Sequence, residues 1–184
     1  MYPSIIGLVG HIRAGKTSTS EYLATTYKYK KASNSDVLRE ISSKLGLGQG
    51  REDLKLLGDS IFSTLGNETI ARYRVAHRAS WPIVVDGIRY EEEIEVYRSC
   101  SSFRLLGIRS PDEVRYSRAQ ALVHEGKDDA QSFADFQKLS SARSEAKVSD
   151  LLKNSDHIID NSGDITSLHH QIDLCLAGWL SAQD

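Results

Sequence analysis

The sequence predicts an α/β fold with three layers, in which a mostly parallel sheet of about five strands carries helices on both faces. Short apolar runs alternate along the chain with helical stretches, and this alternation is typical of crossover connections between parallel strands. The first run, 4–9, is followed at once by G-x-x-x-x-G-K-[ST] at Gly10–Thr17 and then by a stretch that can form a helix. Strand, phosphate-binding loop and helix therefore come in the order that an anion site at a helix N-terminus requires.

Five strands are expected, of which four are short apolar runs and the second is a segment that alternates. They lie at residues 4–9, 29–33, 82–86, 103–108 and 156–160. The second is expected to be an edge or lead-in strand, because three lysines occur in and beside it. Parallel strands with right-handed crossovers should place the binding crevice at the carboxyl ends of the strands.

Helices are expected between these strands, and several of their ends can be read from the sequence. The first covers 16–27, directly after the loop motif. About fifty residues between the second and third strands hold at least two helices, broken at 45–50, and so long an insertion should form a lobe. The helix over about 91–100 opens with three glutamates, which favour the helix dipole, so we interpret them as helix chemistry and not as metal ligands. Residues 110–113, Ser-Pro-Asp-Glu, read as a capping box that opens a helix toward about 126.

Length and composition restrict the class of protein. A chain of 184 residues predicts one domain, 1–184, and a net charge of −2 without a basic stripe excludes a nucleic-acid partner. No apolar run approaches about 18 residues and no signal peptide is recognisable, so we expect a cytoplasmic protein without a membrane partner. The two cysteines fit neither a disulfide framework nor a metal-ligand spacing. Oligomeric state is left open.

The loop motif carries the most specific chemistry in the chain. Gly10 and Gly15 let the backbone curl so that successive N–H groups form an anion nest. Lys16 would reach the β and γ phosphates of ATP, and the Thr17 hydroxyl would be a ligand of Mg²⁺. The residues expected to bind the donor phosphates are Gly10, His11, Ile12, Arg13, Ala14, Gly15, Lys16, Thr17 and Ser18.

Two further segments supply charged groups near this loop. In VVDGIR, Asp86 ends an apolar strand, where its carboxylate could hold Mg²⁺ opposite Thr17. Arg89 would project from the same strand end, and a guanidinium is a bidentate phosphate binder. In SNSDVLREI, Asp36 and Arg39 stand three residues apart at a helix start and so share a face.

These two segments resemble the nucleoside monophosphate kinases, which read S-x-G-D-x-L-R and D-G-x-x-R where this chain reads S-N-S-D-V-L-R and D-G-I-R. The resemblance implies the architecture of the P-loop nucleotide kinases, with a helical acceptor-binding insertion at 35–80 and a small lid at about 115–145. It also implies that Arg39 and Arg89 hold the phosphate of the acceptor nucleotide from two sides. The part of the insertion around Arg51 is more similar to the deoxynucleoside monophosphate kinases, which implies that Arg51 could touch the acceptor. A helix-surface arginine is the interpretation that we prefer for this residue.

The resemblance extends, less specifically, to the second half of the chain. Arg118 falls where these kinases place a lid arginine over the donor nucleotide, whereas Leu122 stands where a second lid arginine would fall. Lys127 and Arg143 are candidate lid cations, and a solvated polar helix explains them equally well.

The strand and turn HIIDNSGD are similar to the segment that packs the donor adenine in these enzymes. Asn161 and Gly163 are therefore candidates for donor binding through their main chains. A capped turn before the last helix explains the same residues equally well.

The expected function is transfer of the γ-phosphate of ATP, with Mg²⁺, to a small nucleotide acceptor, most readily a nucleoside or deoxynucleoside monophosphate. Lys16, Asp86, Arg118 and Asp36 are the expected catalytic residues. One alternative is a dephospho-CoA kinase, whose D-x-D-x-I-A-R-E pattern would make Asp36 a general base for a ribose hydroxyl, although Asn34 replaces the first aspartate. Another is a nucleotide-gated binding module without transfer activity.

Overall fold

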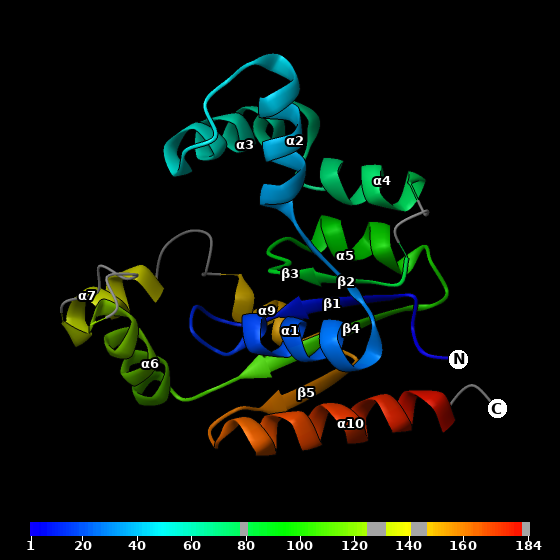
Figure 1. Ribbon diagram of the computed structural model, residues 1–184, viewed down its shortest axis with the longest axis vertical. Helices are drawn as coiled ribbons and strands as arrows, with labels where there is room; N and C mark the ends of the chain where they lie inside the picture. Colours follow the sequence, from blue (N-terminus) through cyan, green and yellow to red (C-terminus); the bar gives the residue numbers. More distant parts are fainter. Residues whose placement is uncertain (78–80, 125–131, 141–146, 182–184) are drawn as a thin grey trace.

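The structure of the chain is a computed structural model that describes residues 1–77, 81–124, 132–140 and 147–181, except for the side chains of 122–124 and 138–140 (Figure 1). Within these residues, five parallel strands form one sheet of order β2-β3-β1-β4-β5. The strands are β1 (Ile5–Val9), β2 (Lys30–Ser33), β3 (Ile83–Asp86), β4 (Phe103–Arg109) and β5 (His157–Asp160). The predicted fold class is confirmed, and β2 lies at an edge of the sheet as expected.

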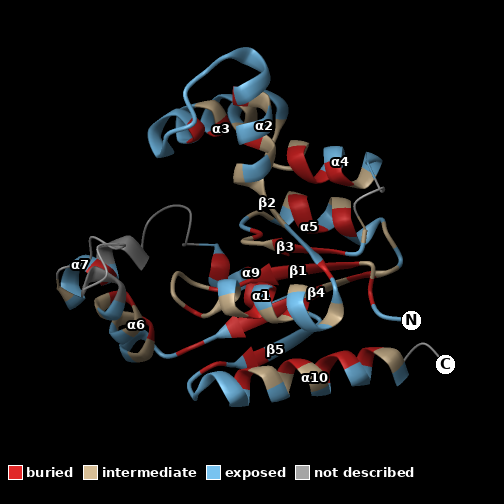
Figure 2. Cartoon of the chain, viewed as in Figure 1, coloured by how far each residue is buried: buried red, intermediate tan, exposed pale blue. Residues whose placement is uncertain are grey.

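Helices cover both faces of the sheet, and the side chains of each strand point alternately into the two cores between sheet and helices. Ile6 and Leu8 point into a core formed with α1 (Lys16–Tyr27) and α10 (Ile165–Ser181). Ile5 and Val9 point into the opposite core, formed with α5 (Glu91–Arg98) and α9 (Val148–Lys153). Figure 2 shows the buried strands between these layers. No helix in the described part of the chain is long and apolar enough to cross a membrane.

The long insertion after β2 forms a helical lobe, as predicted, which stands beyond one end of the sheet in Figure 1. It holds α2 (Asn34–Leu45), α3 (Arg51–Leu65) and α4 (Thr69–Ala76), so the break expected at 45–50 is the α2–α3 connection. Leu38, Leu54 and Ile70 form its own small core. A Cβ on Gly58 would lie 3.1 Å from Leu38 Cδ1, and a glycine there allows α3 to pack closely on α2.

Two lid helices follow β4, and they pack against the phosphate loop. Phe136 of α7 (Phe133–Ser140) is buried with Tyr116 and Ala119 of α6 (Asp112–His124), and Ile12 of the loop joins this cluster. The capping box predicted at Ser110 is shifted, because the helix begins at Asp112, one residue after the predicted first position, Pro111. The Ser110 hydroxyl instead donates a hydrogen bond to the carbonyl of Asn161 (2.9 Å), which satisfies a buried group at the end of β5.

A buried polar cluster joins the lobe to the sheet. The guanidinium of Arg74, on α4, donates to Asn34 Oδ1 (3.1 Å) and to the carbonyl of Ser33 at the end of β2. Glu93, on α5, accepts hydrogen bonds from Asn34 Nδ2 (3.1 Å) and from the backbone N–H of Arg89 (3.0 Å). Burial raises the pKa of the Glu93 carboxyl, and these donors together with Arg74 oppose the rise. Glu93 therefore connects the two segments that the sequence assigns to acceptor binding.

The raised pKa of Glu93 makes stability depend on pH with a definite sign. Between the ordinary glutamate pKa of about 4.3 and the raised native value, the native state binds more protons than the unfolded state. The free energy of unfolding of the wild type should therefore fall with rising pH relative to that of Glu93→Gln. Denaturant titrations of both proteins from pH 4 to pH 7.5 measure this difference.

Glu91→Gln is the matched control, because Glu91 lies exposed in the same first turn of α5. Glu91→Gln measures the effect of losing one carboxylate near a helix N-terminus, so the remaining effect of Glu93→Gln is due to burial. A wild-type advantage over Glu93→Gln that grows as the pH rises would contradict the expectation.

Candidate active site

The phosphate loop lies between the end of β1 and the start of α1, and its carbonyl oxygens are held by side chains. Lys16 Nζ donates to the carbonyls of Gly10 (2.6 Å) and His11 (3.0 Å). Arg115 Nη1, from α6, donates to the carbonyl of Ile12 (3.0 Å). The ammonium of Lys16 therefore lies over the opening of the loop, where a phosphate would replace the carbonyl oxygens as its partners.

The next two carbonyls are held from the same side. Arg118 Nη1 lies 3.4 Å from the carbonyl oxygens of both Arg13 and Ala14, and Asn161 Nδ2 donates to Ala14 O (2.8 Å). In a planar trans peptide the following N–H points opposite to the carbonyl. The N–H of Gly15 therefore points away from Arg118 and Asn161, and the N–H of Arg13, which follows the carbonyl of Ile12, points away from Arg115. The N–H of Ala14 donates to the carbonyl of His11 within the loop (3.1 Å).

Both motif glycines are required by the space around them. A Cβ on Gly15, whose φ is +109°, would overlap the side chain of Asn161. A Cβ on Gly10 would lie 2.5 Å from the carbonyl oxygen of Ile108. Arg13 also adopts a left-handed conformation, with φ +63°, although it carries a Cβ, at a cost of about 1–2 kcal/mol.

A cavity of about 820 Å³ separates the phosphate loop from the lobe, and it brings together most of the predicted site. Lys16 and Thr17 line it from the loop, Asp86 and Arg89 from the end of β3, and Arg39 from α2. The full set of charged side chains around it is Arg13, Lys16, Arg39, Arg51, Lys55, Asp59, Asp86 and Arg89. Six of these are cations and two are carboxylates, so the cavity is suited to an anion of high charge.

Asp86 and Thr17 present oxygen atoms to this cavity. Asp86 ends β3 and pairs in register with Ser33 at the end of β2, so it lies at the carboxyl edge of the sheet as predicted. Burial raises the pKa of its carboxyl, while the charges of Lys16, Lys31 and Arg89 lower it. A carboxylate and a hydroxyl with room for water and phosphate oxygens are hard donors that fit Mg²⁺.

On the lobe side, Asp36 has a structural role. Its carboxylate accepts a hydrogen bond from the backbone N–H of Ser33 (2.8 Å) and so completes a capping box at the start of α2. It also accepts one from Arg39 Nη1 (3.1 Å). Asp36 does not line the cavity, whereas its neighbours Asn34 and Ser35 do. The expectation that Asp36 acts as a general base is therefore not supported, because its carboxylate is used to cap the helix.

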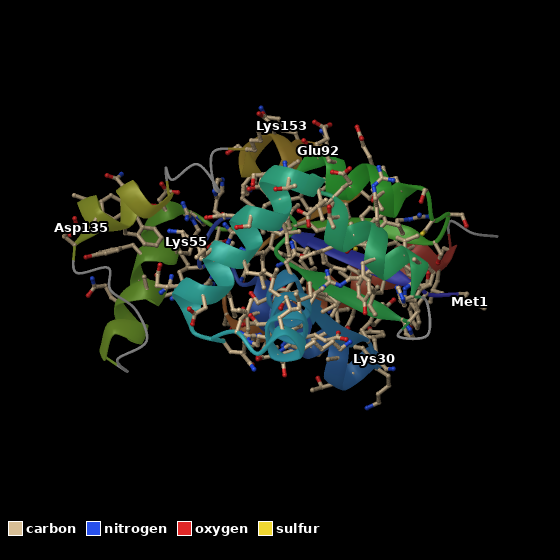
Figure 3. The ribbon with its side chains drawn as sticks, turned by 90° about the horizontal axis from the view of Figure 1, so that it is seen from above. Met1, Lys30, Lys55, Glu92, Asp135 and Lys153 are labelled. Carbon is tan, nitrogen blue, oxygen red and sulfur yellow. The ribbon has the colours of Figure 1, made fainter. Side chains whose placement is uncertain are left out.

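Three charged residues of α3 line the cavity, and the sequence analysis missed two of them, Lys55 and Asp59. Arg51, Lys55 and Asp59 are spaced by four, so they share one face of the helix. Figure 3 looks down on the lobe, with Lys55 labelled on α3. Arg51 is exposed on the helix surface, as expected, and it also lines the cavity. The four-residue spacing was the available signal.

The predicted donor-side residues lie beside the loop. Arg118 Nη2 donates to the carbonyl of Asn161 (2.9 Å), so the lid helix and the turn after β5 meet there. That carbonyl also accepts from Ser110, and the N–H of Asn161 donates to Arg109 O (2.7 Å). Both lone pairs and the N–H are thus used within the protein, which contradicts a main-chain contact from Asn161 to the adenine. Gly163 lies exposed in the same turn.

The remaining predicted residues are divided between described and undescribed parts. His11 Nε2 lies 3.1 Å from Ser149 Oγ, so the loop also contacts α9. Ser18 lies in the first turn of α1. The side chain of Leu122, and all of Lys127 and Arg143, lie outside the described residues.

Comparisons with known proteins agree with this architecture. No known family model matches the chain. A UPF0200 protein of Methanothermobacter thermautotrophicus is 25% identical over 168 residues, which cover 91% of this chain and 86% of that protein.

Among solved structures, the shikimate kinase of Acinetobacter baumannii, in complex with shikimate, has a TM-score of 0.56 at 20% identity. The match covers 95% of this chain and 94% of the shikimate kinase chain. An uncharacterised protein of Eubacterium ventriosum has a TM-score of 0.61 at 12% identity, covering 95% and 98%. The all-parallel sheet, the helices on both its faces and the loop between β1 and α1 are thus those of a P-loop kinase fold.

Proposed function

We propose that the protein is an ATP- and Mg²⁺-dependent phosphotransferase that moves the γ-phosphate to a small nucleotide, with a nucleoside or deoxynucleoside monophosphate as the preferred acceptor. One observation carries this proposal: a single cavity is bounded by the phosphate loop on one side and by Arg39, Arg51 and Lys55 of the lobe on the other. Such an arrangement holds two phosphate-bearing molecules facing each other.

The donor half of the site uses the loop. Its N–H groups and Lys16 would bind the β and γ phosphates of ATP, and the charge of Lys16 would offset the charge that the phosphates bring. Thr17 and Asp86 would hold Mg²⁺, which bridges phosphate oxygens and withdraws charge from them. The nucleoside would lie beside Arg118 and the turn that contains Gly163.

The acceptor half would use Arg89 from the turn after β3 together with Arg39 and Arg51 from the lobe. A phosphate oxygen is already ionised at neutral pH, so transfer to it does not depend on a strong general base. The use of Asp36 as a helix cap therefore favours a phosphate acceptor over the ribose hydroxyl of dephospho-CoA. Charge favours it too, because four cations that could face an acceptor exceed what a monocarboxylic acid such as shikimate would need.

Catalysis by these residues would be positioning and charge compensation. Arg39 and Arg89 would orient an acceptor oxygen in line with the γ-phosphate, and the lobe and the lid helices would exclude water from the site. A hydroxyl-directed kinase and a binding module without transfer remain the competing outcomes of the experiment that follows.

An acceptor panel tests the function directly. ATP consumption is measured with Mg²⁺ against ribo- and deoxynucleoside monophosphates, dephospho-CoA and shikimate, with product detection by chromatography. We expect turnover with at least one monophosphate. Turnover with dephospho-CoA or shikimate alone would identify a hydroxyl acceptor, and ATP binding without turnover in any lane would identify a binding module.

Two substitutions separate the halves of the site. Lys16→Ala should lower kcat by at least about 100-fold, because it removes a charge aimed at the transferring group.

Arg89→Ala should raise the KM of the acceptor by about 10- to 100-fold, because hydrogen bonds to a charged group are lost. It should leave the Kd of ATP nearly unchanged.

Steady-state kinetics and ATP titrations measure both effects. Arg98→Ala is the control, because Arg98 is an exposed arginine on α5 that pairs with Asp156, at a site that does not line the cavity. Equal weakening of ATP and acceptor binding by Arg89→Ala would remove Arg89 from the acceptor half.

A further inference from the structure

Arg13 combines a left-handed backbone with a side chain that lines the cavity. Its backbone is left-handed, with φ +63°, a conformation that glycine adopts without strain. Among the described residues, Lys28 is the other residue besides glycine with positive φ. Lys28 ends α1 at an exposed turn, where its N–H bonds to Leu23 O, whereas Arg13 lies inside the phosphate loop. The end of a helix explains the left-handed backbone of Lys28, whereas a strained arginine inside the phosphate loop needs another explanation.

The side chain of Arg13 lines the same cavity as Lys16, Thr17 and Asp86. It comes from the donor wall, and Arg39 and Arg51 come from the opposite wall. A guanidinium is planar, always charged at neutral pH and able to contact two phosphate oxygens at once. Arg13 therefore brings a second cation, besides Lys16, from the loop that would hold the donor phosphates.

We propose that Arg13 is a further catalytic residue whose guanidinium contacts the phosphoryl group during its transfer. This inference rests on the proposed function. In the step, the bond between the γ phosphorus and the β–γ bridging oxygen breaks and its electron pair stays on ADP. A bond forms between that phosphorus and an acceptor phosphate oxygen. Arg13 gives no proton, and it neutralises charge on the equatorial oxygens of the transferring group.

Side chains from outside the phosphate loop hold its carbonyl oxygens. Arg115 holds the carbonyl of Ile12, and Asn161 holds that of Ala14, while Arg118 contacts the main-chain carbonyl of Arg13 itself. A glycine at position 13 should keep this path and relieve the strain. The substitution thus separates a chemical role of the side chain from a structural one.

The test compares Arg13→Gly with Lys28→Gly as a matched control. Both variants remove a side chain from a left-handed residue, so both should keep or raise Tm. Arg13→Gly should lower kcat by at least about 100-fold while the Kd of ATP changes less than about threefold. Lys28→Gly should leave kcat unchanged. Free guanidinium ion at millimolar concentration should restore part of kcat in Arg13→Gly, and should not do so in Lys16→Ala.

Each other outcome overturns the proposal. Wild-type kcat in Arg13→Gly would show that the side chain takes no part in transfer. A loss of ATP affinity equal to the loss of kcat would make Arg13 a ground-state binding residue. Arg13→Asn, which also tolerates positive φ, repeats the test if the glycine variant fails to fold. If the wild type transfers phosphate to no acceptor, the proposed function and the role of Arg13 are both refuted. If the wild type and Arg13→Gly are both fully active, only the role of Arg13 is refuted.

Discussion

The candidate site depends on how the carbonyl oxygens of the phosphate loop are held. Arg115 and Arg118 from the first lid helix and Asn161 from the turn after β5 together contact the carbonyls of Ile12, Arg13 and Ala14. Since a planar peptide points its two polar groups in opposite directions, the contacts to Ile12 and Ala14 orient the N–H groups of Arg13 and Gly15 that would bind phosphate, whereas the N–H of Ala14 donates to His11 O. The loop motif supplies a backbone that can curl. Residues more than 100 positions later in the chain orient the peptide dipoles of the loop.

The net charge of the chain does not predict the charge of this site. The chain carries a net charge of −2, yet six cations and two carboxylates surround its main cavity. One of these carboxylates, Asp86, is held where burial raises its pKa, so that its charged form costs free energy in the unliganded protein. Burying a charge is unfavourable for the fold alone, which agrees with the proposed role of Asp86 in holding Mg²⁺.

The sequence predicted what depends on local pattern and on the geometry of a parallel sheet. The strands, the loop and the position of Asp86 at a strand end follow from apolar runs and from the rule that carboxyl ends share an edge. Side-chain partners across the fold could not be predicted in this way. Asp36 could act as a base or as a cap, and only the position of the Ser33 N–H decides. Glu93 reads as one of three helix-opening glutamates, whereas the structure places it against Asn34 and Arg89.

The hydrogen bonds of Glu93 restrict how the lobe can move. The first turn of α2 is tied through Asn34 and Glu93 to the β3–α5 turn, so the segments that carry Arg39 and Arg89 are connected by hydrogen bonds. Arg51 and Lys55 lie on α3, which packs on α2 through the core of Leu38, Leu54 and Ile70. That packing connects these two cations to the same turn. One buried carboxylate would thus help to set the spacing between the cations on the two walls of the cavity.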